Sequence, residues 1–389
     1  MAEASLYASD INLAQQELAA GNLGVASDLL DRHRPRVGRK DLRGWEWRYL
    51  WRQCRSDEQF TLDIHLHRAT GVAFSPDGLL SATADAPDGE DETGSKVLLW
   101  DLRSLKQLAP PLTEDAAGSV VFSLDGRYIT FGTLHHGVKV LETSTRAVVT
   151  EFPAKQSLWA HGLAFSRDSK LLAIGDMGRS IALFDIVAGR KLATLAGHRG
   201  SVTCLAFVPD GTKLISGSWD QQVRVWDLAS AISISSWTNH TSVVWGVAVS
   251  PDGQTVASSS EDGTIRLRSM ATGLQLTVAA YQDVWFSSSI AFSPDGKNFA
   301  CGGSDHSIRI WDTASGREVR TLRGNRDEVW AVAYSPDGTT LLSGAKDGGV
   351  RVWSLMTTRH ESSHLESLPE RDFATLSPDG RWLFEIPSL

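Results

Sequence analysis

One six-residue phrase returns along this 389-residue chain and constrains its fold more than any other feature. The phrase is AFSPDG or a variant of it, and its last residue stands at positions 78, 126, 169, 211, 253, 296, 338 and 380. Six of the seven intervals measure 42 or 43 residues, and the first measures 48. A fixed period of about 40–45 residues is typical of arrays in which each unit is a four-stranded blade. The period therefore predicts a repeat architecture rather than two or three unrelated domains.

The content of each unit agrees with short antiparallel strands. The phrase ends in Pro-Asp-Gly, which suits a tight turn because proline presets φ and glycine accepts positive φ. A β-rich run follows, such as KLISGS at 213–218, and after a second turn comes an alternating run such as VRVWD at 223–227. Strands of about six residues joined by short turns are what a blade requires.

Further motifs give these units a family resemblance. The pair Trp-Asp stands at 100–101, 226–227 and 311–312, and Gly-His stands at 197–198. With the period, these residues make 60–386 resemble WD40 repeats, which implies a β-propeller. In the fourth unit, the resemblance implies the family's complete buried hydrogen-bonding set: His198, Ser216, Asp220 and Trp226. Buried polar groups must be paired, so losing one member costs roughly 1–3 kcal/mol.

Other units depart from this set. Arg268 replaces the tryptophan of the fifth unit, and Asn325 replaces the histidine of the seventh. The remaining members in these two units are present: His240, Ser258, Asp262, Ser343, Asp347 and Trp353. The second and third units lack most of the set, so we expect their blades to be looser.

The ends of the array predict how the ring closes. FTLDIH at 60–65 aligns with the outer strand that ends other units, although its three partners lie elsewhere in the chain. The seventh unit offers inner strands near 329–334, 340–345 and 349–354, and an N-terminal outer strand there would leave no open sheet edge. Residues 370–389 begin an eighth unit that is too short to complete. We expect an all-β, seven-bladed propeller over 59–389, with eight blades as the alternative.

Residues 1–58 are expected to form a helical hairpin followed by a helix rich in tryptophan and arginine. In that helix, DLRGWEWRYLWRQC at 41–54, Trp47, Leu50, Trp51 and Cys54 share one face, which Leu42, Trp45 and Tyr49 widen. Packing within the chain, against the propeller or its own hairpin, is the favoured role. A membrane surface and nucleic acid are the alternatives, because residues 32–55 hold nine Lys or Arg against two acids, a charge of +7.

This N-terminal segment is similar to the segment that precedes WD40 arrays in large bacterial proteins, often Ser/Thr kinases. The chain has no kinase signature, so the resemblance implies a free-standing relative of that accessory region. A regulatory module of a bacterial Ser/Thr kinase system, as a fragment or as a partner in trans, is therefore one hypothesis for function.

Tryptophans outside the blade-core position indicate a binding surface. Trp245 and Trp330 share one register in the first strand of their units, and Trp219 precedes the turn aspartate of the fourth unit. The resemblance to WD40 repeats implies that side chains at these positions face the top rim of the propeller, where exposed tryptophans are typical binding hot spots. The candidate partner-binding residues are Trp159, Trp219, Trp245, Trp285, Trp330, Glu261 and Lys346.

Composition and motifs exclude several function classes. The net charge of −8 argues against a general nucleic-acid binder. The chain has no apolar run long enough to span a bilayer and no signal-peptide pattern, which predicts a cytoplasmic protein without membrane insertion. No catalytic, metal or cofactor motif is evident. We expect a non-enzymatic scaffold that binds a protein or peptide, with a hydrolase-like propeller as a less favoured alternative, and the oligomeric state stays open.

Overall fold

The chain forms two compact units, 1–354 and 355–389. In the first unit, the described residues form three helices and seven four-stranded sheets; in the second they form one two-stranded sheet. The computed structural model describes residues 2–19, 23–34, 42–54, 57–87, 94–133, 137–152, 162–175, 177–238, 240–280, 287–356, 373–376 and 383–386.

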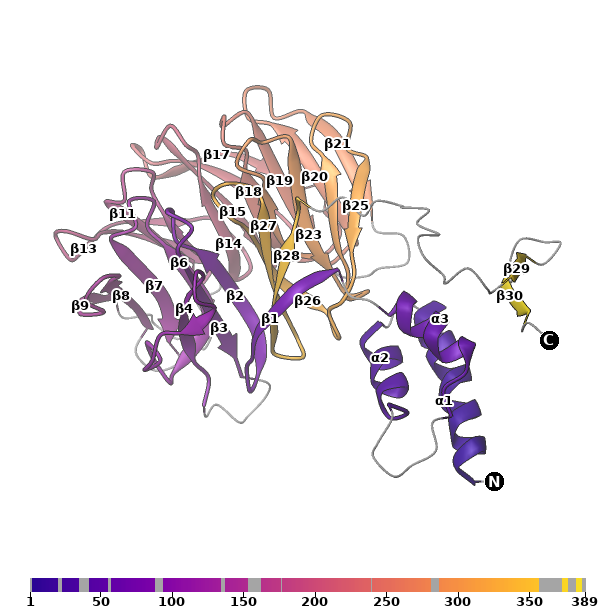
Figure 1. The fold of residues 1–389 in the computed structure, drawn as a ribbon. Helices are drawn as coiled ribbons and strands as arrows, with labels where there is room; N and C mark the ends of the chain where they lie inside the picture. Colours follow the sequence, from indigo (N-terminus) through magenta and orange to yellow (C-terminus); the bar gives the residue numbers. More distant parts are fainter. Residues whose placement is uncertain are drawn as a thin grey trace. The chain divides into compact units, whose positions relative to one another are not determined.

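Each four-stranded sheet of the described chain is a blade, and blades 1–6 take their strands in chain order (Figure 1). Blades 1 and 2 comprise β2 (Arg68–Phe74), β3 (Leu80–Ala86), β4 (Val97–Asp101), β5 (Lys106–Gln107), β6 (Ala116–Phe122), β7 (Tyr128–Thr133), β8 (Gly137–Glu142) and β9 (Val148–Phe152). Blades 3 and 4 comprise β10 (Leu163–Phe165), β11 (Leu171–Gly175), β12 (Ser180–Asp185), β13 (Arg190–Ala196), β14 (Val202–Phe207), β15 (Lys213–Ser218), β16 (Val223–Asp227) and β17 (Ile232–Trp237). Blades 5 and 6 comprise β18 (Val244–Val249), β19 (Thr255–Ser260), β20 (Thr264–Ser269), β21 (Gln275–Ala280), β22 (Ser287–Phe292), β23 (Asn298–Gly303), β24 (Ile308–Asp312) and β25 (Glu318–Leu322).

The repeated phrase forms the turn between the first and second strands of a blade. In blade 1, the Gly78 amide donates to the Ser75 carbonyl (2.9 Å), and the Ser75 hydroxyl accepts from the Leu80 amide (2.9 Å). Gly78 has a φ of +70°, the left-handed conformation that glycine adopts without cost. In blade 3, Ser169 takes this position with a φ of +58°, and its hydroxyl accepts from the Asp125 amide of blade 2 (3.1 Å).

Blade 7 closes the ring with strands from both ends of the unit. Its inner strands are β26 (Val329–Tyr334), β27 (Thr340–Ala345) and β28 (Gly349–Ser354), and its outer strand is β1 (Glu58–Ile64). Strand β1 pairs antiparallel with β28, as Figure 1 shows where an early segment lies beside the last blade. The predicted closure and the seven-bladed fold are confirmed, and an eighth blade is not formed by the described residues.

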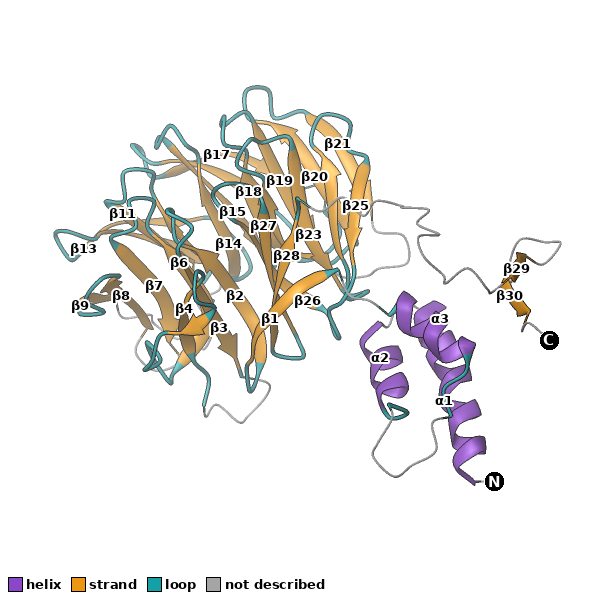
Figure 2. Ribbon diagram, in the orientation of Figure 1, coloured by secondary structure: helices purple, strands orange, loops and turns teal. Residues whose placement is uncertain are grey.

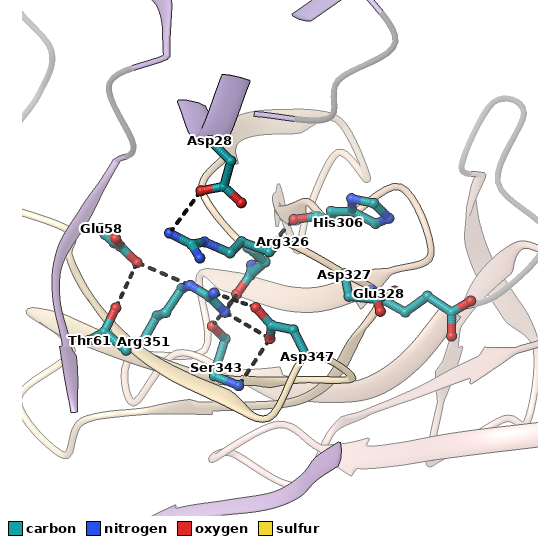
Figure 3. A network of polar contacts seen from close by, with 12 residues as sticks. Asp28, Glu58, Thr61, His306, Arg326, Asp327, Glu328, Ser343, Asp347 and Arg351 are labelled. Carbon is teal, nitrogen blue, oxygen red and sulfur yellow. Dashed lines mark hydrogen bonds and ion pairs between the residues drawn. The ribbon is translucent and has the colours of Figure 1, made fainter. Parts of the chain in front are cut away.

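A buried arginine joins the two ends at this seam (Figure 3). The side chain of Arg351 on β28 is only 4% exposed and lies 2.5 Å from the Asp347 carboxylate and 3.1 Å from the Glu58 carboxylate of β1. Arg351 also donates to Oδ1 of Asn325 (3.4 Å). Beside Asn325, the guanidinium of Arg326 lies 3.7 Å from Asp28 of an N-terminal helix. Charged groups thus connect strands that are almost 300 residues apart in sequence.

The hydrophobic core lies between neighbouring blades rather than at one centre. Between blades 4 and 5, Ile215, Val225 and Trp237 pack against Val247 and Val256. The second strand of most blades is buried along nearly its whole length because a blade covers each of its faces, whereas outer strands such as β17 are mostly exposed. This arrangement leaves side chains at the strand ends available for recognition.

The three helices lie together (Figure 2), and their side chains form a hydrophobic core of their own. They are α1 (Ala2–Ala19), α2 (Leu23–Asp31) and α3 (Trp45–Gln53). Trp47, Leu50 and Cys54 are buried against α1 and α2, and the Trp47 indole donates to the Leu30 carbonyl (2.9 Å). The predicted inward face of the helix is therefore present, and it packs on the hairpin.

Two aromatic residues do not join that face. Trp45 is 54% exposed and Tyr49 is 50% exposed, so the expectation that they widen the apolar face of α3 is wrong. The physical reason is the narrow contact: α1 and α2 cover the side of α3 that holds Trp47 and Leu50, while residues 45 and 49 lie on the opposite side of the helical wheel.

In the second unit, β29 (Phe373–Leu376) pairs antiparallel with β30 (Leu383–Ile386). This hairpin occupies the sequence that was expected to begin an eighth repeat. Its two strands form a two-stranded sheet rather than a four-stranded blade.

Candidate partner-binding site

A β-bulge recurs near the start of the innermost strand in several blades. In blades 1, 4, 5 and 7, the pairing with the second strand skips one residue: Thr70, Thr203, Trp245 and Trp330 respectively. A bulge residue stands outside the hydrogen-bonded ladder, which re-aims its side chain. These bulges lie at the end of the propeller where the innermost strands begin, which we call the top.

The two kinds of bulge residue make different contacts. Thr70 donates its hydroxyl to the Gly118 carbonyl of blade 2 (3.0 Å), and Thr203 donates to the Val244 carbonyl of blade 5. These threonines join neighbouring blades. The indoles of Trp245 and Trp330 instead meet each other edge to face, with ring centroids 5.9 Å apart, although blade 6 lies between their own blades in the chain.

Trp219 and Arg68 extend this contact at both ends. Trp219 follows the end of β15, at the same top end, and its ring centroid lies 6.4 Å from that of Trp245. The guanidinium of Arg68 lies over the ring of Trp330, 5.1 Å from its centroid. We call Trp219, Trp245, Trp330 and Arg68 the rim row. It brings together three tryptophans and one cation from blades 4, 5, 7 and 1.

The three tryptophans of the rim row differ in their exposure to solvent. Trp219 is 47% exposed, whereas Trp245 and Trp330 are half-buried. Gly200 lies directly under Trp219, since a Cβ there would come within 2.9 Å of the Trp219 Cβ. A large apolar side chain that is fixed at its base and open at its edge is suited to burial against a partner.

The other candidate rim residues take separate places. Glu261 accepts a hydrogen bond from the Ser242 hydroxyl (2.8 Å), and the exposed Lys346 lies 3.6 Å from Glu328. The structure does not bring them into the rim row by any contact among the described residues. Trp159 and Trp285 lie outside the described residues.

Below the rim row, the buried polar set of blade 4 forms a continuous chain. The Trp226 indole donates to the Ser216 hydroxyl (2.8 Å), and Ser216 Oγ lies 2.7 Å from His198 Nε2. His198 Nδ1 lies 2.9 Å from the Asp220 carboxylate. If the Ser216 hydroxyl donates to Nε2, an Nδ1-protonated imidazole completes the chain. The carboxylate also accepts from the Arg199 amide (2.8 Å), so this set holds the loop and turn that flank Trp219.

Blades 5 and 7 show what happens when a member changes. In blade 5, His240 lies 2.9 Å from Ser258 and 3.0 Å from Asp262. The buried Arg268 turns away to the Gly273 carbonyl (3.0 Å) and lies over the Trp237 ring. In blade 7, the Ser343 hydroxyl donates to Asn325 (3.0 Å) and accepts from Trp353 (2.8 Å), while Asp347 pairs with Arg351.

A further set in blade 1 was missed by sequence reasoning. His65 Nε2 lies 2.9 Å from the Thr83 hydroxyl, which accepts from the Trp100 indole (3.1 Å). Asp85 is 3.6 Å from His65 Nδ1. The 18-residue spacing from His65 to Thr83 equals that from His198 to Ser216, and this signal could have identified the pair.

Asp220 provides a pH test of the buried set. Burial raises the pKa of its carboxyl, but hydrogen bonds from His198 and two backbone amides outweigh this and lower the pKa to about 2. The ionised carboxylate therefore stabilises the fold above about pH 4, and this contribution is lost as the pH falls toward 2. We expect the difference in free energy of unfolding between wild type and Asp220→Asn to be largest near about pH 6 and to shrink toward pH 2 in urea titrations. A difference that stays constant over this range would contradict the ionic role.

No group of three or more His, Cys, Asp or Glu side chains with the geometry to hold a metal ion occurs among the described residues. Within the same part of the chain, no helix is long and apolar enough to cross a membrane.

Comparison with known proteins decides the nature of the blades. The family described as WD domain, G-beta repeat matches residues 189–227, 232–269, 279–312 and 316–354. The chain carries WD40 repeats. The four matched segments run from the outer strand of blade 3 to the third strand of blade 7, and Trp245 and Trp330 each lie within one of them.

One curated relative is similar to part of this chain. The Arabidopsis thaliana protein named Pre-mRNA-processing factor 19 homolog 2 is 33% identical over 134 residues. The similar stretch covers 33% of this chain and 23% of that protein. The chain therefore spans less than a quarter of the length of that relative.

Proposed function

We propose that this protein is a non-catalytic scaffold whose WD40 propeller binds a protein or peptide over its top rim. WD40 propellers generally bind protein partners, but a fold does not specify the partner, so the proposal depends on the site. The observation that carries it is the rim row, in which three tryptophans from blades 4, 5 and 7 make one edge-to-face series at the mouth of the ring.

The geometry favours a partner that covers the row rather than a small substrate that enters the ring. The indoles of Trp245 and Trp330 contact each other, and the guanidinium of Arg68 lies over the Trp330 ring. Trp219, the most exposed member, offers its open edge at one end. Buried tryptophan and arginine anchors supply most of the free energy in protein interfaces, each worth about 2 kcal/mol or more at a hot spot.

The test is a variant of the row. Trp219→Ala/Trp245→Ala/Trp330→Ala is expected to lose its partner, with a Kd raised by at least about a hundredfold if two hot-spot side chains are lost. Proteins captured by the wild type are identified by mass spectrometry, and the purified partner is then titrated by calorimetry. The control is Ile234→Ala, which removes an exposed side chain from the outer strand β17.

The comparison separates binding from folding. Thermal unfolding of the triple variant must remain cooperative, and the Ile234→Ala control must retain the partner. If the folded triple variant keeps every partner of the wild type with unchanged affinity, the rim does not bind and the proposal fails.

A further inference from the structure

The α3 helix presents a second face that its packing does not use. Trp45, Arg48 and Tyr49 stand at i, i+3 and i+4, and all three are exposed. They lie opposite Trp47 and Leu50, which fill the core of the three-helix bundle. The rings of Trp45 and Tyr49 are neighbours, with centroids 6.4 Å apart and planes tilted by 57°.

This face is not required for the bundle to fold. The buried core is built from α1, α2 and the opposite side of α3. Leaving a tryptophan and a tyrosine half in water forgoes the free energy of burying their apolar surface. Both side chains also have a polar group at one end, which makes them stable where an apolar phase meets water.

Positive charge gathers in the same part of the chain. Residues 1–31 contain no Lys or Arg, whereas residues 32–55 contain nine against two acids. The guanidinium of Arg34 lies 4.6 Å from the ring centroid of Trp51, and that of Arg43 lies 4.8 Å from that of Trp47. These cations are held at the surface of the bundle, beside tryptophans. The remainder of the chain, 1–31 and 56–389, holds 29 Lys or Arg against 44 acids, a net charge of −15, so an anionic surface attracts this segment and repels the rest.

We propose that the exposed face of α3, formed by Trp45, Arg48 and Tyr49, binds an anionic phospholipid surface. Aromatic side chains lie at the headgroup level of a bilayer, and arginines there pair with lipid phosphates and carboxylates. The contact is peripheral, because the helix is nine residues long and carries only one such face. It is independent of the rim row and of the function proposed for it.

The ring geometry favours a bilayer over a single-stranded nucleic acid. Proteins that bind single strands stack bases on open aromatic faces along a positively charged groove. Here the two rings are inclined to each other by 57° at 6.4 Å, which leaves no parallel slot for a base between them. They also lie on the convex surface of a helix. A helix face with aromatic and cationic side chains is suited to lie in the plane of the membrane–water interface.

Vesicle sedimentation tests this proposal with the full chain. The probes are phosphatidylcholine vesicles with and without one third phosphatidylserine. We expect binding to the anionic vesicles only, weakening as salt rises. Arg48→Ala should reduce the partition coefficient about fivefold, the effect of one arginine near an anionic surface. Trp45→Ala/Tyr49→Ala should reduce it about tenfold or more, because two amphipathic rings are lost.

Matched controls make the result specific. Trp219→Ala removes a tryptophan of similar exposure from the propeller rim and should leave vesicle binding unchanged. Thermal unfolding of each α3 variant should match that of the wild type, since the side chains are exposed. The proposal is overturned if the wild type binds neither vesicle type, if it binds neutral vesicles equally, or if Trp45→Ala/Tyr49→Ala binds like the wild type. It is also overturned if the wild type shifts an oligothymidylate strand, the double variant does not, and neither partitions onto vesicles.

Discussion

A chain from which residues 1–64 are deleted should lose at least about 5 kcal/mol of the free energy of unfolding of its propeller. The deletion removes β1, the outer strand of blade 7. Phe60 and Leu62 then no longer pack against the core between blades 7 and 1, each worth about 1.5–3 kcal/mol when buried. The hydrogen-bonding edge of β28 becomes open, and Arg351 loses its contact with Glu58. Thermal unfolding and size-exclusion chromatography measure the loss and the expected aggregation.

The matched control is deletion of residues 1–54, which removes the helical bundle but keeps β1. This shorter deletion should leave the propeller monomeric and cooperative in unfolding. If both deletions unfold at the same temperature, β1 does not close the ring, and the seam is not the structural tie that its pairing indicates.

Arg351→Ala should cost about 3–5 kcal/mol, because it removes a buried cation and leaves the partly buried carboxylates of Asp347 and Glu58 without the charge that both contact. Asn325 also loses a donor within the buried set of blade 7. Urea unfolding of the full chain gives the change in free energy. The effect is large because the side chain is 4% exposed, so water does not replace the lost partner.

Blade 6 offers a matched control for this variant. Arg309 stands in the same register and pairs with Asp305, four residues before it, at 2.7 Å. Its pair is more exposed than that of blade 7, so Arg309→Ala should cost about 1 kcal/mol or less. If the two variants lose the same free energy of unfolding, burial of Arg351 at the seam does not strengthen its ion pair, and the prediction is wrong.

The periodic parts of the molecule could be predicted from the sequence because each repeats a local rule. A turn that needs Pro-Asp-Gly and a strand that alternates in hydropathy recur at one spacing, so the repeat length and the four-stranded unit follow, while eight blades stayed an alternative to seven. Closure was predictable for the same reason: FTLDIH resembles an outer strand, and an outer strand needs a partner. These inferences depend on neighbours in sequence or on the same unit repeated.

Features that depend on three-dimensional packing could not be predicted. The helical wheel places Trp45 and Trp47 on the same short helix, but only the arrangement of α1 and α2 decides which side of it is covered. The contact between Trp245 and Trp330 joins residues 85 positions apart, in blades that are not consecutive. In blade 1, the insertion before Trp100 obscured the polar set, even though the spacing from His65 to Thr83 was regular.

At the bulges of the inner strands, the choice of side chain does not depend on the pairing register of the strand, although these two requirements usually conflict. Each bulge residue is skipped by the ladder, so threonine and tryptophan occupy equivalent positions while the paired residues on either side keep their register. A side chain at a bulge position can be replaced without a change in the pairing of the strands around it. Substitutions at a few of these bulge positions can therefore give the same propeller a different ligand specificity.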